Sequence, residues 1–165
     1  MAVKRSNAKK KSSGSGKRRT AISDKGRSKK RSIRVVIADD EPVMLDQIGM
    51  LLESDFDVVG RACNGRELVE AVQHLSPSVA VADITMPEMD GIEATRRITK
   101  TNPKVKVVIL SVHSDQAIVE AAFAAGASGY VAKLYASTEL IPAIKTVLGG
   151  RRYRPRALRS SKSRR

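Results

Sequence analysis

The stretch SVAVADITMPEMDG, residues 78–91, joins a short apolar run to an acidic residue and then to a loop-forming sequence. Residues 79–82 are all apolar, and the run ends at Asp83. A short continuous apolar run is typical of a strand that is buried on both faces, as in a parallel sheet. A buried strand that ends on a carboxylate presents that charge at one edge of the sheet. Asp83 is therefore the first candidate site residue.

Similar apolar runs recur through the middle of the chain and alternate with segments of helical spacing. The sequence predicts strands within 33–41, 57–63, 78–84, 105–111 and 128–133. It predicts helices at 42–55, 66–75, 90–100, 115–126 and 137–150. Five strands that alternate with five helices predict an α/β fold: a doubly wound (βα)5 parallel five-stranded sheet of the flavodoxin-like type, with strand order 2-1-3-4-5.

The formal charge of +14 is unevenly distributed along the chain. Residues 1–32 contain 13 Lys or Arg and one acidic residue, and residues 149–165 contain eight Lys or Arg and no acidic residue. Residues 33–148 hold 10 basic and 16 acidic residues, a net charge of −6. The two ends are also poor in apolar residues. The sequence predicts a disordered basic tail at 1–32, one domain at 33–150 and a second basic tail at 151–165.

Clustered Lys and Arg on flexible arms are typical of binding to the phosphate backbone of a nucleic acid. A solvated tail that meets acidic protein or lipid surfaces is the alternative. No apolar stretch approaches the roughly 18 residues that a membrane span needs, so we expect a soluble cytoplasmic protein without a membrane partner. Cys63 is the only cysteine, which excludes an intramolecular disulfide, and we expect it to be a small buried residue.

Polar residues stand at the carboxyl ends of four predicted strands. Asp39 and Asp40 end the first strand, Asp83 the third, Ser111 the fourth and Lys133 the fifth. Doubly wound sheets bind ligands at the carboxyl ends of their strands, so these side chains should converge. Three carboxylates in one pocket repel each other, and Mg²⁺ with its preference for oxygen ligands would relieve that repulsion.

The chemistry of this set points to phosphoryl transfer. A carboxylate can attack phosphorus and form an aspartyl phosphate, while a metal ion and Lys133 neutralise the transferring group. The structural alternative is that Asp39, Asp40 and Ser111 each cap the helix that follows. Capping does not explain why a lysine should converge with them.

The chain closely resembles the receiver domain of bacterial two-component response regulators, nearest to the NarL/FixJ-like subfamily. The resemblance covers residues 33 to 150 and rests on the motifs VIADDE, VADITMPEMDGIEATRRI, VVILSVH and GASGYVAK. Proteins of that subfamily usually carry a helix-turn-helix domain after the receiver, and here a basic tail takes that place. The resemblance implies a phosphorelay protein that is not an enzyme beyond catalysing its own phosphorylation and dephosphorylation.

The resemblance also implies roles for individual residues. Asp83 would accept a phosphoryl group from a sensor histidine kinase or a small phosphodonor. Asp40, Asp83 and the backbone carbonyl of Thr85 would bind Mg²⁺, with Asp39 acting through water. Lys133 would pair with the phosphoryl oxygens.

The same resemblance assigns a switch to two further residues. Ser111 would move toward the phosphoryl group, and Tyr130 would turn inward with it. His113 falls where the family tunes hydrolysis of the phosphoryl bond. Leu134 departs from the proline that many receivers have after the lysine. Pro142, early in the last predicted helix, could delay or kink its start and bears on a homodimer through that face.

Two other functions compete with a signalling receiver. A Mg²⁺-dependent phosphohydrolase of the haloacid-dehalogenase type would use Asp83 as nucleophile, but it needs a second aspartate where this chain has Thr85. A nucleic-acid-binding architectural protein would use the fold only as a scaffold for the basic tails. The intact acidic set argues against the scaffold hypothesis, and a receiver that binds DNA through its tails combines both features.

Overall fold

The structure is a computed structural model, and it describes residues 32–155. Within this part of the chain it contains the five predicted strands: β1 (Arg34–Ala38), β2 (Asp57–Ala62), β3 (Val79–Ala82), β4 (Lys106–Ser111) and β5 (Gly129–Ala132). The helices are α1 (Pro42–Leu52), α2 (Gly65–Leu75), α3 (Gly91–Thr101), α4 (Gln116–Ala124) and α5 (Ala136–Leu148), with a 3₁₀ turn, η1 (Lys133–Tyr135), before α5.

The strands form one parallel sheet in the order β2-β1-β3-β4-β5, which confirms the predicted fold class. β1 and β3 are neighbours with Ala38 opposite Ala82, and the backbone N–H of Asp83 donates to the carbonyl of Ala38 at 2.9 Å. Asp39 and Asp83 each follow the last residue of their strand. The register therefore brings these two acidic residues to the same edge of the sheet.

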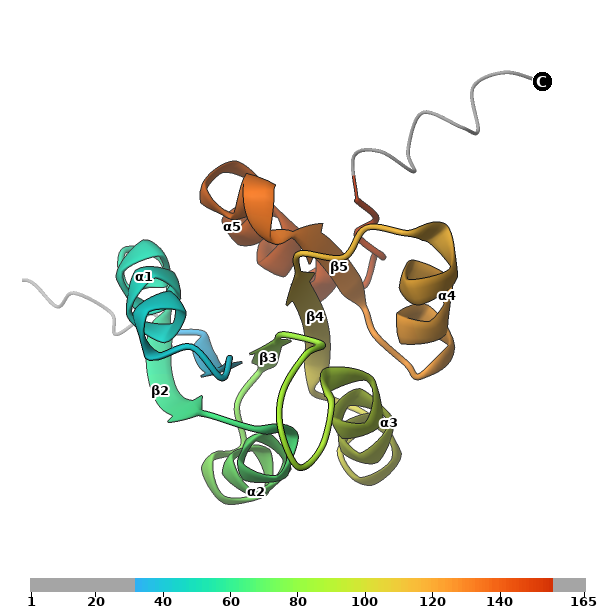
Figure 1. Cartoon of the computed structure of the whole chain (residues 1–165). Helices are drawn as coiled ribbons and strands as arrows, with labels where there is room; N and C mark the ends of the chain where they lie inside the picture. Colours follow the sequence, from blue (N-terminus) through green and yellow to red (C-terminus); the bar gives the residue numbers. More distant parts are fainter. Residues whose placement is uncertain (1–31, 156–165) are drawn as a thin grey trace, which may run out of the picture. The chain divides into compact units, whose positions relative to one another are not determined.

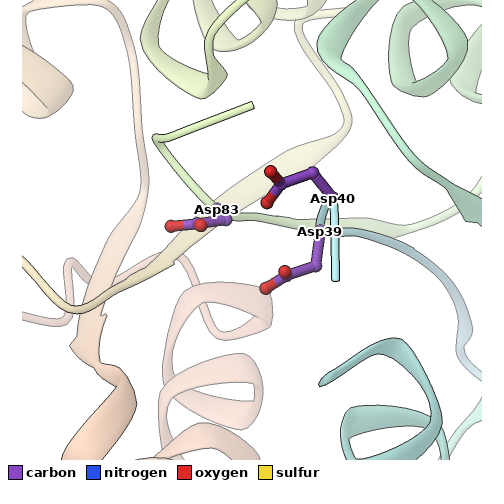
Figure 2. Close-up of side chains that lie close together, drawn as sticks. All are labelled: Asp39, Asp40 and Asp83. Atoms are coloured by element: carbon purple, nitrogen blue, oxygen red, sulfur yellow. The ribbon is translucent and has the colours of Figure 1, made fainter. Parts of the chain in front are cut away.

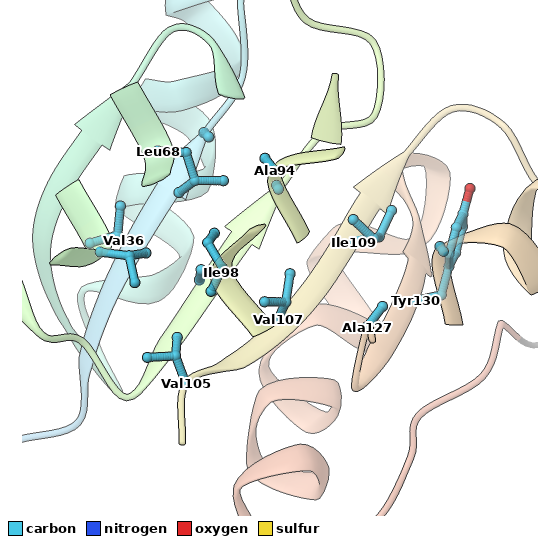
Figure 3. Close-up of a cluster of buried hydrophobic side chains, with 14 of the residues drawn as sticks. Val36, Leu68, Ala94, Ile98, Val105, Val107, Ile109, Ala127 and Tyr130 are labelled. Atoms are coloured by element: carbon cyan, nitrogen blue, oxygen red, sulfur yellow. The ribbon is translucent and has the colours of Figure 1, made fainter. Parts of the chain in front are cut away.

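The sheet separates two apolar layers, because alternate residues of each strand face opposite sides. One layer packs β1, β3, β4 and β5 against α1 and α5, and its helical members include Ile48, Leu52, Leu140 and Ile144. The other packs the strands against α2, α3 and α4 (Figures 1 and 3). Strands covered on both faces explain the near-continuous apolar runs in the sequence.

Helix starts are set by local sequence. The Asn64 side chain accepts from the N–H of Glu67 at 2.8 Å, and Glu67 in turn accepts from the N–H of Cys63, a reciprocal capping arrangement at the start of α2. Asp90 caps α3 through a single bond, accepting from the N–H of Glu93 at 2.8 Å. Such caps hold α2 and α3 in fixed positions at the carboxyl edge of the sheet.

Cys63 corrects one expectation. It is exposed rather than buried. It lies just past the end of β2, which is an edge strand, and its N–H is used in the start of α2. The sequence pattern placed it at the end of an apolar strand, but the chain has already left the sheet there.

The last residues described correct a second expectation. Tyr153, assigned to a disordered tail at 151–165, is buried and forms a parallel bridge with Gly129 of β5. The free edge of β5 offers backbone groups for pairing: the Tyr130 N–H donates to the Tyr153 carbonyl, and the Tyr153 N–H donates to the carbonyl of Ser128, the residue before β5. Residues 1–31 and 156–165, which hold most of both predicted tails, lie outside the described residues.

Pro142 lies inside α5 rather than near its start, because the helix begins at Ala136. The helix continues through it, and the Thr146 hydroxyl donates to the Pro142 carbonyl at 2.7 Å. The peptide bond between Lys133 and Leu134 is trans, and Leu134 is 82% exposed. No helix within residues 32–155 is long and apolar enough to cross a membrane.

Candidate phosphoacceptor site

Three carboxylates meet at the carboxyl edge of the sheet, as the sequence predicts. Asp39, Asp40 and Asp83 each offer an oxygen, and these oxygens lie within 4.8 Å of one another (Figure 2). Asp39 is 0% exposed and Asp83 is 5% exposed, whereas Asp40 is exposed to solvent. The cluster is therefore open on the Asp40 side and enclosed on the side of β1 and β3.

Lys133 reaches into this cluster from η1. Its Nζ lies 2.7 Å from Oδ2 of Asp39 and 3.0 Å from Oδ2 of Asp83. Burial lowers the pKa of the Lys133 ammonium, but the hydrogen bonds and charges of Asp39 and Asp83 outweigh burial and leave that pKa above its ordinary value. Lys133 is therefore a cation at neutral pH, and it is shared by two buried carboxylates.

Helix capping does not account for these residues. The N-cap of α1 is Glu41, and that of α4 is Asp115, four residues after Ser111. Neither N-cap residue makes a side-chain capping bond. Oδ1 of Asp39 does accept from the N–H of Glu41 at 3.0 Å, but Oδ2 points to Lys133. Within the set, Lys133 contacts Asp39 and Asp83, and these contacts are not helix caps.

The loop after β3 is shaped around Asp83. The N–H of Ile84 donates to Oδ1 of Asp83 at 2.7 Å, and the N–H of Gly91 donates to the Ile84 carbonyl at 2.9 Å. A Cβ on Gly91 would lie inside contact distance of the Asp83 backbone carbonyl. Only glycine allows α3 to begin this close to Asp83, so Gly91 fixes the path of the acidic loop.

Thr85 and His113 come together at the rim of the site. Thr85 is exposed, and its hydroxyl lies 3.4 Å from Nε2 of His113, which belongs to the segment after β4. Sequence spacing did not link these two side chains, because they are 28 residues apart and belong to different loops. The contact joins the loop after Asp83 to the segment after Ser111.

Ser111 and Tyr130 lie behind that rim, in the layer covered by α4. Both side chains are 0% exposed, and the Tyr130 hydroxyl donates to the His113 carbonyl at 2.7 Å. Burial raises the pKa of the Tyr130 hydroxyl to about 12; a hydrogen bond with Ser111 acts against that rise, and the charges of Asp83 and Asp115 add to it. Tyr130 already occupies the inward position that the resemblance reserves for the phosphorylated state.

The donor set fits a hard divalent cation. The cluster holds three carboxylate groups against one ammonium, and their oxygens lie within 4.8 Å of one another. Oxygen ligands at this density, with solvent access beside Asp40, suit Mg²⁺, which retains several of its waters when bound. Softer metals would favour thiolate or imidazole ligands, and the cluster has neither.

Comparison with known proteins agrees with this geometry. The sequence-family model described as the response regulator receiver domain matches residues 35–145 of this chain. The chain is 36% identical over 115 residues to the chemotaxis protein CheY of Thermotoga maritima, covering 69% of this chain and 96% of that protein. It is 38% identical over 123 residues to the transcriptional regulatory protein DegU of Brevibacillus brevis, covering 73% of this chain and 52% of DegU.

Among solved structures, a LuxR-family two-component response regulator from Aurantimonas sp. SI85-9A1 superposes with a TM-score of 0.71 at 35% identity, covering 74% of this chain and 89% of that one. The chain therefore belongs to the response regulator receiver domain family. Receiver domains act in phosphorelay signalling, where they accept a phosphoryl group from a histidine kinase or a small phosphodonor. The chain spans about half the length of the curated regulators DegU and LnrK that it matches.

Proposed function

We propose that Asp83 is the phosphoacceptor of this receiver and that Lys133 and the neighbouring acids form its reaction site. The observation that carries the proposal is the position of Lys133, whose ammonium contacts both Asp83 and Asp39 in a buried cluster. A structural ion pair would need one carboxylate for one ammonium. The surplus of negative charge is what a site needs if a divalent cation joins it for phosphoryl transfer.

In the proposed reaction, a carboxylate oxygen of Asp83 attacks the phosphorus of the donor. A new O–P bond forms on Asp83, and the bond from phosphorus to the donor's nitrogen or oxygen breaks, leaving its electron pair on the donor. The ammonium of Lys133 stays near the phosphoryl oxygens and offsets their charge. When bound at Asp40, Asp83 and the backbone carbonyl of Thr85, with Asp39 acting through water, Mg²⁺ would supply further neutralisation of the transferring group.

The response to phosphorylation is proposed to pass through the segment that follows β4. Ser111 would donate its hydroxyl to the phosphoryl group, and this movement would be shared with Tyr130, which is tied to the same segment through the His113 carbonyl. A phosphoryl group adds charge and strong acceptor oxygens at one edge of the sheet. This charge would shift the equilibrium between alternative positions of α4, which packs beside Tyr130.

Phosphorylation by acetyl phosphate in Mg²⁺ buffer, followed by intact-protein mass spectrometry, tests the proposal. The wild-type chain should gain the mass of one phosphoryl group, and the Asp83→Asn variant should gain none. Asp90→Asn is the matched control, because Asn caps a helix as well as Asp and the residue lies at the start of α3. Phosphorylation of Asp83→Asn at the wild-type level would refute the assignment.

We also propose that the basic ends of the chain bind nucleic acid. The supporting observation is the separation of charge, with +12 in residues 1–32, +8 in residues 149–165 and −6 between them. Fluorescence anisotropy of labelled duplex DNA across a salt series tests this. Binding should weaken steeply with salt, with a slope of about −0.9 for each phosphate contact. A chain lacking residues 1–32 that binds as tightly as the whole chain would exclude the N-terminal end as the DNA contact.

A further inference from the structure

The chain returns to the sheet after α5 and the two glycines that follow it, Gly149 and Gly150. Residues 151–155 form this returning segment and are called the strap below. The N–H of Tyr153 donates to the Ser128 carbonyl at 3.1 Å, and the N–H of Tyr130 donates to the Tyr153 carbonyl at 2.8 Å. Tyr153 and Pro155 are buried. The strap thus extends the sheet beyond β5 at one bridge, and it meets β5 at Tyr130 itself.

The strap also contacts α4 through its arginine side chains. The guanidinium carbons of Arg152 and Arg154 lie 5.6 Å and 4.7 Å from the centroid of the Phe123 ring. Nη1 of Arg154 lies 2.7 Å from Oε1 of Glu120, one turn earlier on the same helix. In an extended segment alternate side chains face opposite sides, so the two arginines meet α4 while Tyr153 packs into the layer beneath α5. The strap joins β5, α4 and α5.

Tyr130 connects this strap to the phosphoacceptor site. Its backbone N–H is held by Tyr153, and its hydroxyl is held by the His113 carbonyl at 2.7 Å. The side chain lies in the apolar layer (Figure 3), and the same layer contains Val119, Ala122 and Phe123 of α4. The segment it holds directly follows Ser111, the last residue of β4, and forms the rim where His113 meets Thr85. Any contact that fixes Tyr130 and α4 therefore also fixes Ser111 and residues 112–113, which form one side of the site and are called the Ser111 wall below.

We propose that Arg152 and Arg154 are positioning residues for phosphoryl binding at Asp83: by clamping α4 to the strap, they keep Tyr130 inside and the Ser111 wall in place. This inference rests on the proposed function of Asp83. Coupling between two sites is reciprocal, so a phosphoryl group at Asp83 would in turn strengthen the attachment of the strap. The strap leads directly into the basic residues 156–165, and through it the state of Asp83 would reach that end of the chain.

The test compares two ligands on the whole chain. Beryllofluoride with saturating Mg²⁺ mimics the phosphoryl group and, in the proposed mechanism, contacts the Ser111 wall, whereas Mg²⁺ alone would need only the acidic cluster. Isothermal titration calorimetry should show beryllofluoride binding about three- to tenfold weaker in the double variant Arg152→Ala/Arg154→Ala than in the wild type, because the competent arrangement is less populated. Affinity for Mg²⁺ alone should not change.

A matched control removes the same charge from two arginines that do not contact α4. Arg34 and Arg151 are exposed, and the contacts with Phe123 and Glu120 involve neither of them. The double variant Arg34→Ala/Arg151→Ala should bind beryllofluoride as the wild type does. Glu120→Gln weakens the ion pair between α4 and Arg154 through a substitution on α4, and the sequence of the strap stays unchanged. It should reduce beryllofluoride affinity about twofold, which keeps the test decisive if the strap variant folds poorly.

Three results would overturn the inference: unchanged beryllofluoride affinity in both clamp variants, an equal loss in the charge control, or a parallel loss of Mg²⁺ and beryllofluoride affinity. Each would show that the strap is a packing element without influence on the Ser111 wall. Failure of the wild-type chain to bind beryllofluoride at all is a different result. It would refute the proposed role of Asp83 and the strap inference with it.

Discussion

The ammonium nitrogen of Lys133 lies 3.0 Å from Oδ2 of Asp83, although the two residues are 50 positions apart in the chain. The same nitrogen lies 2.7 Å from Oδ2 of Asp39. Two buried carboxylates thus depend on one cation, and the position of that cation depends on β5 and η1 being correctly placed against β1 and β3. The stability of the fold and the chemistry of the site are linked through this contact.

Replacing Lys133 by Met should lower the free energy of unfolding by about 3 to 5 kcal/mol at neutral pH without Mg²⁺, because two carboxylates remain in the cluster without their cation. Added Mg²⁺ should recover part of this loss. Urea unfolding followed by circular dichroism measures both. Lys145→Met is the control, since Lys145 pairs with Asp55 at the surface, and it should cost no more than about 1 kcal/mol. Equal losses in the two variants would contradict the buried role of Lys133.

Asp40 is exposed, so its substitution should affect metal binding more than folding. Asp40→Asn should weaken Mg²⁺ binding by at least about tenfold, since a direct oxygen ligand is lost, and should not lower the unfolding midpoint without Mg²⁺, since it removes one of three mutually repelling carboxylates. Calorimetric titration with Mg²⁺ provides the measurement. Asp46→Asn, a change at an exposed acid on α1 paired with Arg61, should bind Mg²⁺ as the wild type does. If Asp46→Asn lost as much affinity, general surface charge would explain the effect.

The fold should lose stability in alkaline solution through Tyr130 and Lys133. The pKa of Tyr130 is raised to about 12, so its contribution is complete below the unfolded-state pKa of about 10 and is lost as the pH rises toward 12. The pKa of Lys133 is also raised, and its contribution likewise disappears as the pH rises through the folded-state value. Ultraviolet titration should show a late tyrosine ionisation that is missing in Tyr130→Phe. An unchanged titration curve in that variant would refute the assignment.

Gly91→Ala should destabilise the chain by about 1 to 3 kcal/mol and slow phosphorylation of Asp83, because the new Cβ meets the Asp83 backbone carbonyl and must displace the acidic loop or α3. Thermal unfolding and acetyl phosphate labelling measure the two effects. Gly149→Ala is the matched control, since a Cβ there meets only ordinary contacts and φ is −76°. Its stability should be unchanged or up to about 1 kcal/mol higher. A neutral Gly91→Ala would show that the loop has room to adjust.

Much of the fold was predictable because its signals are local. The apolar run ending at Asp83 and the alternation of strand and helix patterns identify a parallel sheet, and the ends of the strands give Asp39, Asp83, Ser111 and Lys133. The structure brings three of these residues, Asp39, Asp83 and Lys133, into direct contact. Periodicity suffices here because a strand buried on both faces must be apolar until it ends.

Features that depend on distant segments were missed or misplaced. Tyr153 lies in a stretch rich in arginine, and local composition assigns it to a tail; only the free edge of β5 explains why it is buried. Cys63 follows an apolar run, but it lies past the end of an edge strand and is exposed. The contact between Thr85 and His113 has no signal in spacing, because two separate loops meet there.

The sequence by itself determined the order of strands and helices, the acidic residues at the strand ends and the division of charge along the chain, since each follows from neighbouring residues. The tertiary structure decided which carboxylates share the ammonium of Lys133, that Tyr130 lies inside, and that Arg152 and Arg154 reach across to α4. These contacts join residues far apart in sequence, and their energies depend on distances and burial that exist only after the sheet and its helices have packed.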